Sequence, residues 1–245
     1  MEVHHHSHPA SGGTRKKWTH YFWEFLMLFL AVFCGFLAEY QLEHKIEKDR
    51  AKEFAVTLIS DLQKDTAAIK FHIEFRETIY KNADSLMTLL KYDSFDSNQE
   101  KIAKHFTVIN DRRALEASRG TIDQLKHSGS LRYFKNKQVT NELVSYYNLL
   151  DIINHWIQYL FDYESATLGP FSRAHYDKRY DDIIFRGQKK LRPFRKTGEE
   201  EQVLLYNICA TFGNLNEILA MSVLPKALEK ADNLLELIKK EYGLK

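Results

Sequence analysis

The feature that most constrains this chain is an apolar run at residues 25–38, FLMLFLAVFCGFLA, which contains no charged residue. As a helix, fourteen residues span about 21 Å, less than the roughly 30 Å of hydrocarbon in a bilayer. Runs of this length also occur in buried core helices and in signal peptides. The run is apolar on every face, which argues against a core helix. No small-x-small cleavage motif follows it, which argues against a signal peptide.

The flanks of the run make it long enough to cross a membrane. Residues 18–42 contain aromatic side chains at both ends, where an interfacial belt is expected, at Trp18, Tyr21, Trp23 and Tyr40. Glu24 and Glu39 would each lie about 11 Å from the segment centre, close enough to approach the headgroups. We therefore predict a transmembrane helix at residues 21–40, with the lipid bilayer as its partner. A disordered, His-rich basic tail at 1–20 precedes it, and a soluble helical domain at 41–245 follows it.

The orientation depends on basic residues, which lie on both sides of the predicted span. Arg15, Lys16 and Lys17 precede it, and Lys45, Lys48, Arg50 and Lys52 follow it. The positive-inside rule is therefore nearly balanced. A short basic tail is easily retained in the cytoplasm, whereas a long domain is translocated largely regardless of charge. We predict a cytoplasmic N-terminus and an exported soluble domain.

One face of the predicted span collects small and acidic residues. At 100° per residue, the following side chains lie near one line: Glu24, Ala31, Gly35, Ala38, Glu39 and Leu42. Ala31 and Gly35 form the small-xxx-small spacing that lets two membrane helices approach closely. The hypothesis is that this face packs against another membrane helix, from a second copy of the chain or from a protein partner. Chance alignment in a short helix is the alternative.

Few turn-forming residues interrupt the rest of the chain, which holds only 10 Gly and 4 Pro in total. Apolar residues recur with 3-4 spacing in a first long stretch, at Ile59, Leu62, Thr66, Ile69, Ile73, Arg76, Tyr80, Ala83, Met87 and Leu90. Eight of these ten positions suit burial, and Thr66 and Arg76 do not. The spacing predicts a helix that ends near residue 91. Ser97 and Glu100 then form a capping-box pattern for a short helix that reaches about Thr107.

Two further stretches have the same helical spacing. One contains Val139, Leu143, Tyr146, Leu150, Ile153, Ile157 and Leu160, and we expect it to stop at Gly169 and Pro170. The other begins after Gly198 with three glutamates, is kinked or restarted at Pro225, and ends at Gly243. No long alternating run predicts a strand. The predicted fold is all-α: the transmembrane helix continues into an antiparallel bundle of three or four long helices.

Residues that could carry chemistry are sparse. His4, His5, His6 and His8 could bind a transition metal, but they lie in a tail without fixed geometry. A di-iron bundle needs two inward Glu-x-x-His pairs, and the chain has only Glu2 with His5. Asp151 and His155, one helical turn apart, are read as a surface salt bridge. No serine-nucleophile motif, phosphate loop or Cys-x-x-Cys is present. We therefore expect no metal, no cofactor and no catalytic residue.

The charge of the chain also limits its partners. Beyond residue 40 there are 32 Lys and Arg against 30 Asp and Glu, so no basic footprint for nucleic acid is present and we expect none to bind. A local cluster of basic residues does occur, at Arg186, Lys189, Lys190, Arg192, Arg195 and Lys196. This cluster is a solvated loop or, alternatively, a contact for anionic headgroups or an acidic partner.

A loop at residues 121–139 contains the tripeptide SGS at residues 128–130. Ser128 and Gly129 are predicted to end one helix, and Ser130 to cap the next. The loop either connects two helices or presents a binding surface. In the second case, the residues expected to contact a ligand or partner are Lys126, Ser128, Gly129 and Arg132.

Several segments resemble a known family. They are the His-rich start, YFWEFLMLFLAVFCGFLAE at 21–39, LISDLQKDT at 58–66, and LKHSGSLR at 125–132 with Asn136 beyond it. The chain resembles a family of uncharacterised bacterial single-pass membrane proteins, a domain-of-unknown-function group common in Bacteroidota. Phe33 and Cys34 depart from the smaller or polar pair expected there. The resemblance implies an inner-membrane protein with an N-terminal anchor, and it implies no activity, cofactor or catalytic residue.

Two functions from different classes fit these predictions. The first is a membrane-tethered scaffold or protein-interaction module, because the chain combines an anchor, a packing face and long helices with no recognisable chemistry. The second is a sensor whose helical domain binds a small ligand and acts through a membrane partner. An enzyme comes third, and a deep polar pocket with clustered carboxylates or histidines would favour it.

Overall fold

The computed structural model describes residues 14–92, 95–180, 193–195 and 197–244. The chain divides into two compact units, residues 1–51 and 52–245, which we describe separately. Of the described residues, 88% are helical and none belongs to a strand, although an isolated antiparallel bridge joins Tyr176 and Phe194. The prediction of an all-α protein is confirmed.

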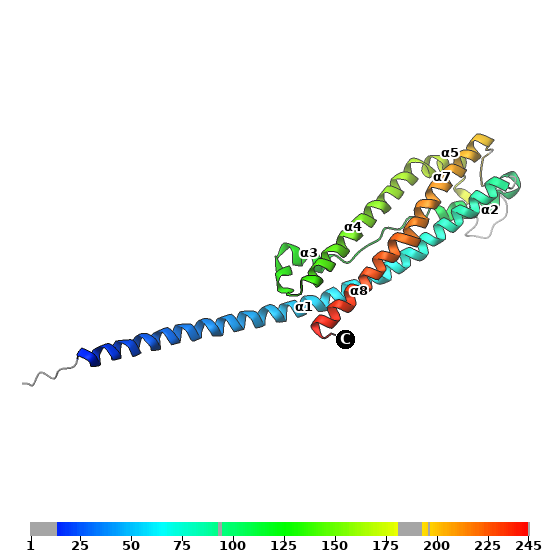
Figure 1. Cartoon of the computed structure of the whole chain (residues 1–245). Helices are drawn as coiled ribbons and strands as arrows, with labels where there is room; N and C mark the ends of the chain where they lie inside the picture. Colours follow the sequence, from blue (N-terminus) through cyan, green and yellow to red (C-terminus); the bar gives the residue numbers. More distant parts are fainter. Residues whose placement is uncertain (1–13, 93–94, 181–192, 196, 245) are drawn as a thin grey trace, which may run out of the picture. The chain divides into compact units, whose positions relative to one another are not determined.

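The first unit consists of the N-terminal part of α1, a helix that extends over Thr14–Tyr92 and so contributes to both units (Figure 1). This part contains an 18-residue window with a mean hydropathy of 2.0, and none of that window is buried. It is long enough and apolar enough to cross a membrane, as predicted. The helix begins at Thr14, whereas we expected a disordered tail up to residue 20, and residues 1–13 with their histidines lie outside the described residues.

The part of α1 in the second unit buries one line of side chains. Its members follow 3-4 spacing at Ala55, Leu58, Leu62, Asp65, Ile69, His72, Arg76, Ile79, Ala83 and Leu86. Six of the ten predicted positions are buried, and the other four are only partly buried; the buried six are Ile59, Leu62, Thr66, Ile69, Arg76 and Ala83. The prediction chose positions with apolar side chains. Ile73, Tyr80 and Met87 are nevertheless only partly buried, while the polar residues Asp65 and His72 are buried. Thr66 and Arg76, the two expected exceptions, are also buried.

The remaining helical elements follow in chain order. They are α2 (Phe95–Ile109), α3 (Gly120–His127), the 3₁₀ turn η1 (Ser130–Tyr133), α4 (Lys137–Ala166), α5 (Leu168–His175), α7 (Glu199–Ile218), the π turn η2 (Leu219–Val223) and α8 (Leu224–Tyr242). Local chemistry explains several boundaries. Asn136 caps α4 by accepting a hydrogen bond from the Gln138 N–H. Gly243, with a φ of 60°, ends α8 in the left-handed conformation that glycine adopts without steric cost.

Several predicted boundaries need correction. Ser97 is not an N-cap, because α2 already begins at Phe95. Ser130 opens a 3₁₀ turn rather than capping an α-helix, since Asn136 caps the next one. Gly169 and Pro170 do not end α4, which stops at Ala166, but lie in the first turn of α5. The predicted interruption near Pro225 takes the form of a π turn, after which α8 starts with this proline in its first turn.

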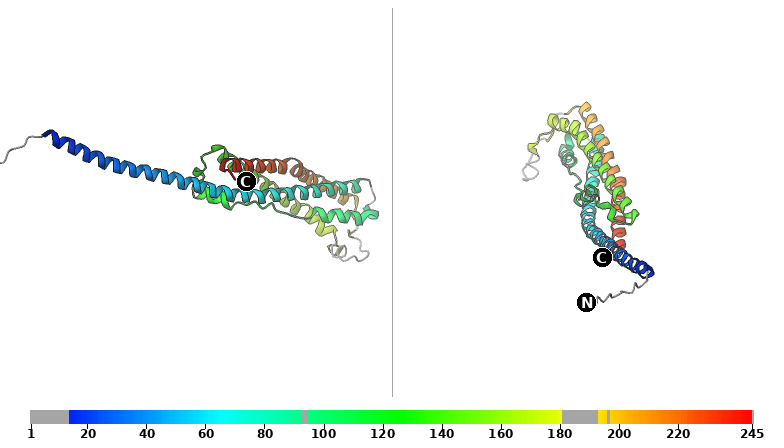
Figure 2. Two further views of the ribbon diagram at one scale, coloured as in Figure 1. Left: turned by 90° about the horizontal axis from the view of Figure 1, so that it is seen from below. Right: turned by 90° about the vertical axis from the view of Figure 1, so that its left-hand side faces the viewer.

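Within the second unit, α4, α7 and α8 lie alongside residues 52–92 of α1 (Figures 1 and 2). Tyr146 on α4 donates a hydrogen bond to Asp65 on α1. A Cβ added to Gly213 on α7 would lie 3.0 Å from the Ala83 Cβ, so a glycine at this position lets α7 approach α1 closely. Lys230 of α8 pairs with Glu142 of α4 at 2.8 Å. Apolar side chains from all of these helices form one core.

Candidate functional site

A segment without helix or strand, residues 110–119, links α2 to α3, and we call it the strap. The strap belongs to no helix or sheet, so its backbone N–H and C=O groups need other hydrogen-bond partners where they are buried. Buried polar side chains of α1 supply three of them, which explains why Asp65, His72 and Arg76 occupy positions in an otherwise apolar seam. These polar residues of the seam therefore form hydrogen bonds with the backbone of the strap.

Asp65 holds the C-terminal end of the strap. Its Oδ1 accepts the Ser118 N–H at 2.7 Å, and its Oδ2 accepts the Tyr146 hydroxyl at 3.0 Å. The neighbouring Tyr147 hydroxyl donates to the Ser118 carbonyl at 3.0 Å. Burial raises the pKa of Asp65, and the bonds from Ser118 and Tyr146 oppose that rise. The carboxyl group, both tyrosines and the strap thus form one connected network between α1 and α4.

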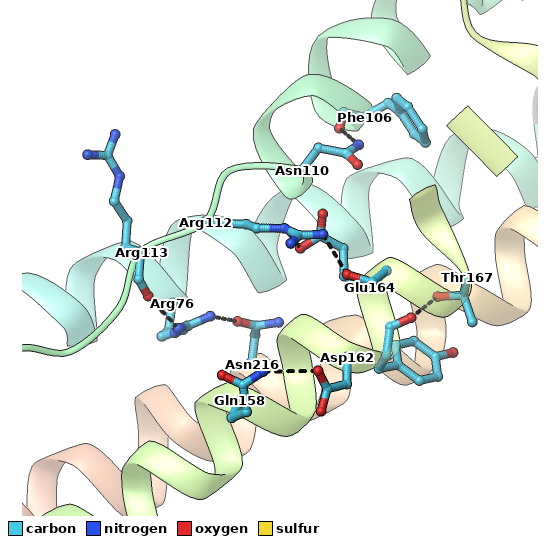
Figure 3. Close-up of polar contacts among 12 residues, drawn as sticks. Arg76, Phe106, Asn110, Arg112, Arg113, Gln158, Asp162, Glu164, Thr167 and Asn216 are labelled. Atoms are coloured by element: carbon cyan, nitrogen blue, oxygen red, sulfur yellow. Dashed lines mark hydrogen bonds and ion pairs between the residues drawn. The ribbon is translucent and has the colours of Figure 1, made fainter. Parts of the chain in front are cut away.

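His72 and Arg76 bind the middle of the strap, and Figure 3 shows the contacts of Arg76. The His72 Nε2 lies 3.0 Å from the Ala114 carbonyl oxygen and must donate, while its Nδ1 has no hydrogen-bond partner among the described residues. Burial, and then the charge of Arg76, lower the pKa of His72 to about 4. Arg76 donates to the Arg113 carbonyl at 3.2 Å and to the Asn216 side chain at 3.1 Å. Burial lowers the pKa of Arg76 to about 10.

Ion pairs connect the strap to α4. The Arg112 Nε lies 2.7 Å from the Glu164 Oε2, and its Nη2 donates to the Ser165 hydroxyl at 3.0 Å (Figure 3). Arg119 pairs with Asp151 at 2.6 Å. The predicted salt bridge between Asp151 and His155 is wrong, because the His155 Nδ1 instead lies 2.6 Å from the Asp151 carbonyl oxygen.

A cleft of about 940 Å³ opens beside the Arg112–Glu164 pair. Residues of α1, α2, α5, the strap and the end of α4 line it. Phe71, Phe75, Phe106 and Tyr176 supply an aromatic wall, and charged side chains from both Arg112 and Glu164 face the same space. This volume lies within the range of small-molecule sites, which are mostly apolar and carry a few convergent polar groups.

Glu164 is the most perturbed acid in the cleft. Only 5% of its surface is exposed, although it belongs to an open cleft. Burial raises its pKa, and the hydrogen bond and charge of Arg112 oppose the rise. No group of three or more His, Cys, Asp or Glu side chains is placed to hold a metal ion within the part of the chain that the structure describes. The chemistry that this cleft offers is ionic and aromatic recognition.

The residues of the predicted membrane-helix face all lie on the described part of α1 in the first unit. Glu24, Ala31, Gly35, Ala38 and Glu39 are exposed, and a Cβ added to Gly35 would have no other atom within 4 Å. No residue between 14 and 51 covers this face, which leaves it open to a second helix within the described part of the unit.

The predicted interaction loop lies at the junction of α3 and η1. Lys126, Ser128, Gly129 and Arg132 are exposed, and Gly129 has a φ of 67°. Thr121, just ahead of this loop, donates to the Asp61 carboxylate at 2.5 Å. This bond joins the start of α3 to residues 58–66 of α1, one of the segments that carry the family resemblance.

Most of the predicted basic patch cannot be placed. Arg186, Lys189, Lys190, Arg192 and Lys196 lie outside the described residues. Arg195 is exposed, and its backbone N–H donates to the His175 carbonyl at 2.9 Å.

An apolar surface on α4 and α7 was not predicted. Ile152, Trp156 and Tyr159 are 54%, 42% and 53% exposed, and Leu215 of α7 joins Trp156 and Tyr159 around a hollow of about 460 Å³. We call these four residues the α4–α7 patch. A signal for it was present in the sequence, because the α4 members recur at a spacing of 4 and 3 residues beside the buried seam.

The cleft itself was also missed, and its residues carry weaker signals. Arg112 and Glu164 are 52 positions apart, and no local pattern relates them. Asp65, His72 and Arg76 do recur with seam spacing, which could have indicated buried polar partners.

Comparisons of the chain with protein families, with curated proteins and with solved structures found no match.

Proposed function

We propose that this chain is a membrane-anchored interaction module, in which residues 21–40 cross a bilayer and the helical unit docks a protein partner. The anchor is supported by the unburied apolar window of α1 and by exposed aromatic side chains at its ends, Trp18, Trp23 and Tyr40. Under this proposal the face at Ala31 and Gly35 packs against a second membrane helix, from another copy or from the partner.

The observation that carries the docking role is the α4–α7 patch. Exposed apolar patches on folded domains mark interaction sites, and Trp and Tyr are the side chains that most often dominate binding energy. Trp156 and Tyr159 lie one helical turn apart on the same side of α4, where both remain largely exposed. A partner with an apolar helix or loop would cover them.

The proposal includes the finer architecture and location. We infer that α1, α4 and the α7–α8 pair form an antiparallel bundle, which is supported by the bonds from Asp65 to Tyr146 and from Arg76 to Asn216. We also infer, from the resemblance, membership of that family and a location in a bacterial inner membrane. The exported domain is inferred from the short basic tail before the span, which is easily retained in the cytoplasm. Alkaline phosphatase fused after residue 245 should then be active in cells, and an inactive fusion would reverse the orientation.

Site-specific photo-cross-linking tests the docking role. A photoreactive phenylalanine analogue at position 159 of the full chain, activated in native membranes, should yield one discrete adduct. The same group at Asp232, which is exposed on α8, provides the control and should yield no adduct of that mass. Trp156→Ala should weaken the adduct at position 159. Identical adducts at both positions, or none at 159, would contradict docking through the patch.

The cleft favours a second candidate function, ligand sensing through a membrane partner. Its volume suits a small molecule, and the strap on its wall connects it through Arg112 to α4 and through Arg113 to Arg76 of α1. A ligand that displaced Arg112 from Glu164 would alter this connection between the two helices.

A further inference from the structure

Some of the charged side chains that line the cleft form no ion pair with one another. Among the described residues, three acids and three bases line it: Glu74, Asp111 and Glu164, with Arg112, Arg173 and Lys178. Glu164 is paired with Arg112, and Asp111 is paired with Arg113. Arg173 and Lys178 form no ion pair with any other described residue. Of the acids that line the cleft in the described part of the chain, Glu74 is the one that forms no ion pair with a described residue.

Arg173 lies beside Gly169 at the start of α5. A Cβ added to Gly169 would lie 3.4 Å from the Arg173 Nη1 and 3.5 Å from the Glu164 carbonyl oxygen. The guanidinium therefore rests against bare backbone at the start of α5, in a space that any larger residue at 169 would restrict. Arginine presents its N–H groups as a planar fork that matches carboxylate and phosphate oxygens.

Arg112 retains unused donors. Its Nε contacts Glu164 and its Nη2 contacts Ser165, while a guanidinium carries five N–H groups. Its side chain is 46% exposed, compared with 6% for its partner Glu164. An anion can therefore approach Arg112 from the cleft without first breaking the existing pair.

The opposite lining is apolar. Phe71 is 52% exposed, stacks on Phe75 with ring centroids 6.3 Å apart, and borders the cleft with it. Phe106 and Tyr176, whose centroids are 5.2 Å apart, close the inner end. These rings would contact the body of a ligand while the arginines contact its charged group.

We infer that the cleft binds a small organic anion, a carboxylate or phosphate attached to an apolar ring or chain, with Arg112 and Arg173 on the anion and Phe71 and Phe75 on the body. This inference rests on the second proposed function, ligand sensing, and specifies the chemical class of its ligand. It is independent of docking through the α4–α7 patch.

The test is calorimetric titration of the full chain in detergent with four related compounds. Two are anions, 3-phenylpropionate and phenyl phosphate, which distinguish a carboxylate site from a phosphate site. The others are 3-phenylpropylamine and 3-phenylpropan-1-ol. At least one anion should bind saturably at one site per chain, and the amine and the alcohol should not.

Matched variants locate the site. Arg173→Gln should weaken anion binding about tenfold or more, as expected for the loss of a charge-assisted hydrogen bond. Lys104→Gln removes one positive charge from an exposed position of α2 outside the cleft and should leave the dissociation constant unchanged. Phe71→Ala should weaken 3-phenylpropionate more than it weakens propionate.

Two failures are distinguishable. If the amine or the alcohol binds as tightly as the anions, the cleft is a ligand site but the assignment to anions is overturned. If none of the four compounds binds, or if Arg173→Gln binds like Lys104→Gln, the inference is overturned. Absence of all binding also removes the support for ligand sensing.

Discussion

The two parts of α1 differ in how their side chains are buried. Residues 18–42 carry apolar side chains on every face, and none of them is buried. Residues 52–92 bury a single line of side chains, and three members of that line, Asp65, His72 and Arg76, are polar or charged. The side chains of the apolar part that contact one another belong to the same helix, as Phe25, Phe29 and Phe33 do, whereas the amphipathic part packs against other helices.

If residues 21–40 cross a bilayer, as we propose, the difference follows from what surrounds each part. A helix in a bilayer satisfies its own backbone groups and can expose apolar side chains all around. A helix in a water-soluble domain must bury its apolar stripe against other helices, and each buried polar side chain then needs a partner. The strap supplies those partners to α1, so the second part is specified by contacts that the first part lacks.

The largest expected effect comes from placing charged residues in the proposed membrane span. Replacing Leu30 and Phe33 with aspartate adds two charges near the centre of the span, at a cost of about 5–7 kcal/mol in insertion free energy. The chain should then leave the membrane pellet after alkaline carbonate extraction. Ser60→Asp with Gln63→Asp, at exposed positions of the second part, is the control and should stay in the pellet. Retention of the doubly charged span would contradict the anchor.

The next effect compares one leucine from each part of the helix. Leu62 is fully buried, and Leu62→Ala should lower the free energy of unfolding by about 2–5 kcal/mol through lost contacts and a cavity. Leu28 is 67% exposed, and Leu28→Ala should leave it unchanged. Chemical denaturation of the full chain in detergent measures both. Equal losses would show that the two parts are not packed differently.

The third effect depends on pH. Because the pKa of His72 falls from 6.5 to about 4 on folding, the unfolded chain takes up the proton first as the pH decreases. The contribution of His72 is therefore full above pH 6.5 and is lost as the pH falls towards 4, by about 3 kcal/mol. The raised pKa values of Asp65 and Glu164 act in the opposite sense, since their contributions are lost as the pH rises.

The variant His72→Gln isolates the histidine, because an amide can still donate to the Ala114 carbonyl but does not titrate. Denaturation midpoints of the two proteins should converge at pH 4 and diverge towards pH 7. A constant difference across this range would exclude His72 as the titrating group.

The smallest effect is expected from the removal of a single hydroxyl group. Tyr146→Phe deletes the buried hydrogen bond to Asp65 and should cost about 1.5–3 kcal/mol in unfolding free energy. Tyr159→Phe, at an exposed position of the same helix, should cost almost nothing. The same denaturation experiment resolves the pair, and an equal cost would show that the hydroxyl of Tyr146 does not stabilise the network.

The predictable parts of the fold were those governed by local chemistry. The all-α class, the start of α7 at Glu199 and the end of α8 at Gly243 followed from helical spacing, first-turn glutamates and a left-handed glycine. Four of the ten predicted seam positions of α1 were wrong, because the burial of adjacent positions such as Ile73 and His72 can be ranked only once the neighbouring helices are known. The strap has no periodicity, so its path could not be predicted.

The candidate site was less accessible to prediction. The cleft joins Arg112 to Glu164 and Phe71 to Phe106, and these residues come from segments that are remote in sequence. The α4–α7 patch did carry a helical spacing, but the sequence could not show which side of α4 remains uncovered.

By itself, the sequence determined the apolar span, the helical class and some helix ends, because these depend on side chains within a few residues of each other. Only the tertiary structure decided that Asp65, His72 and Arg76 are buried, that the strap satisfies them, and that a cleft forms beside Glu164. Such features depend on which distant groups share a low-dielectric space, and the free energy of a buried polar group is set by its partners rather than by its neighbours in sequence.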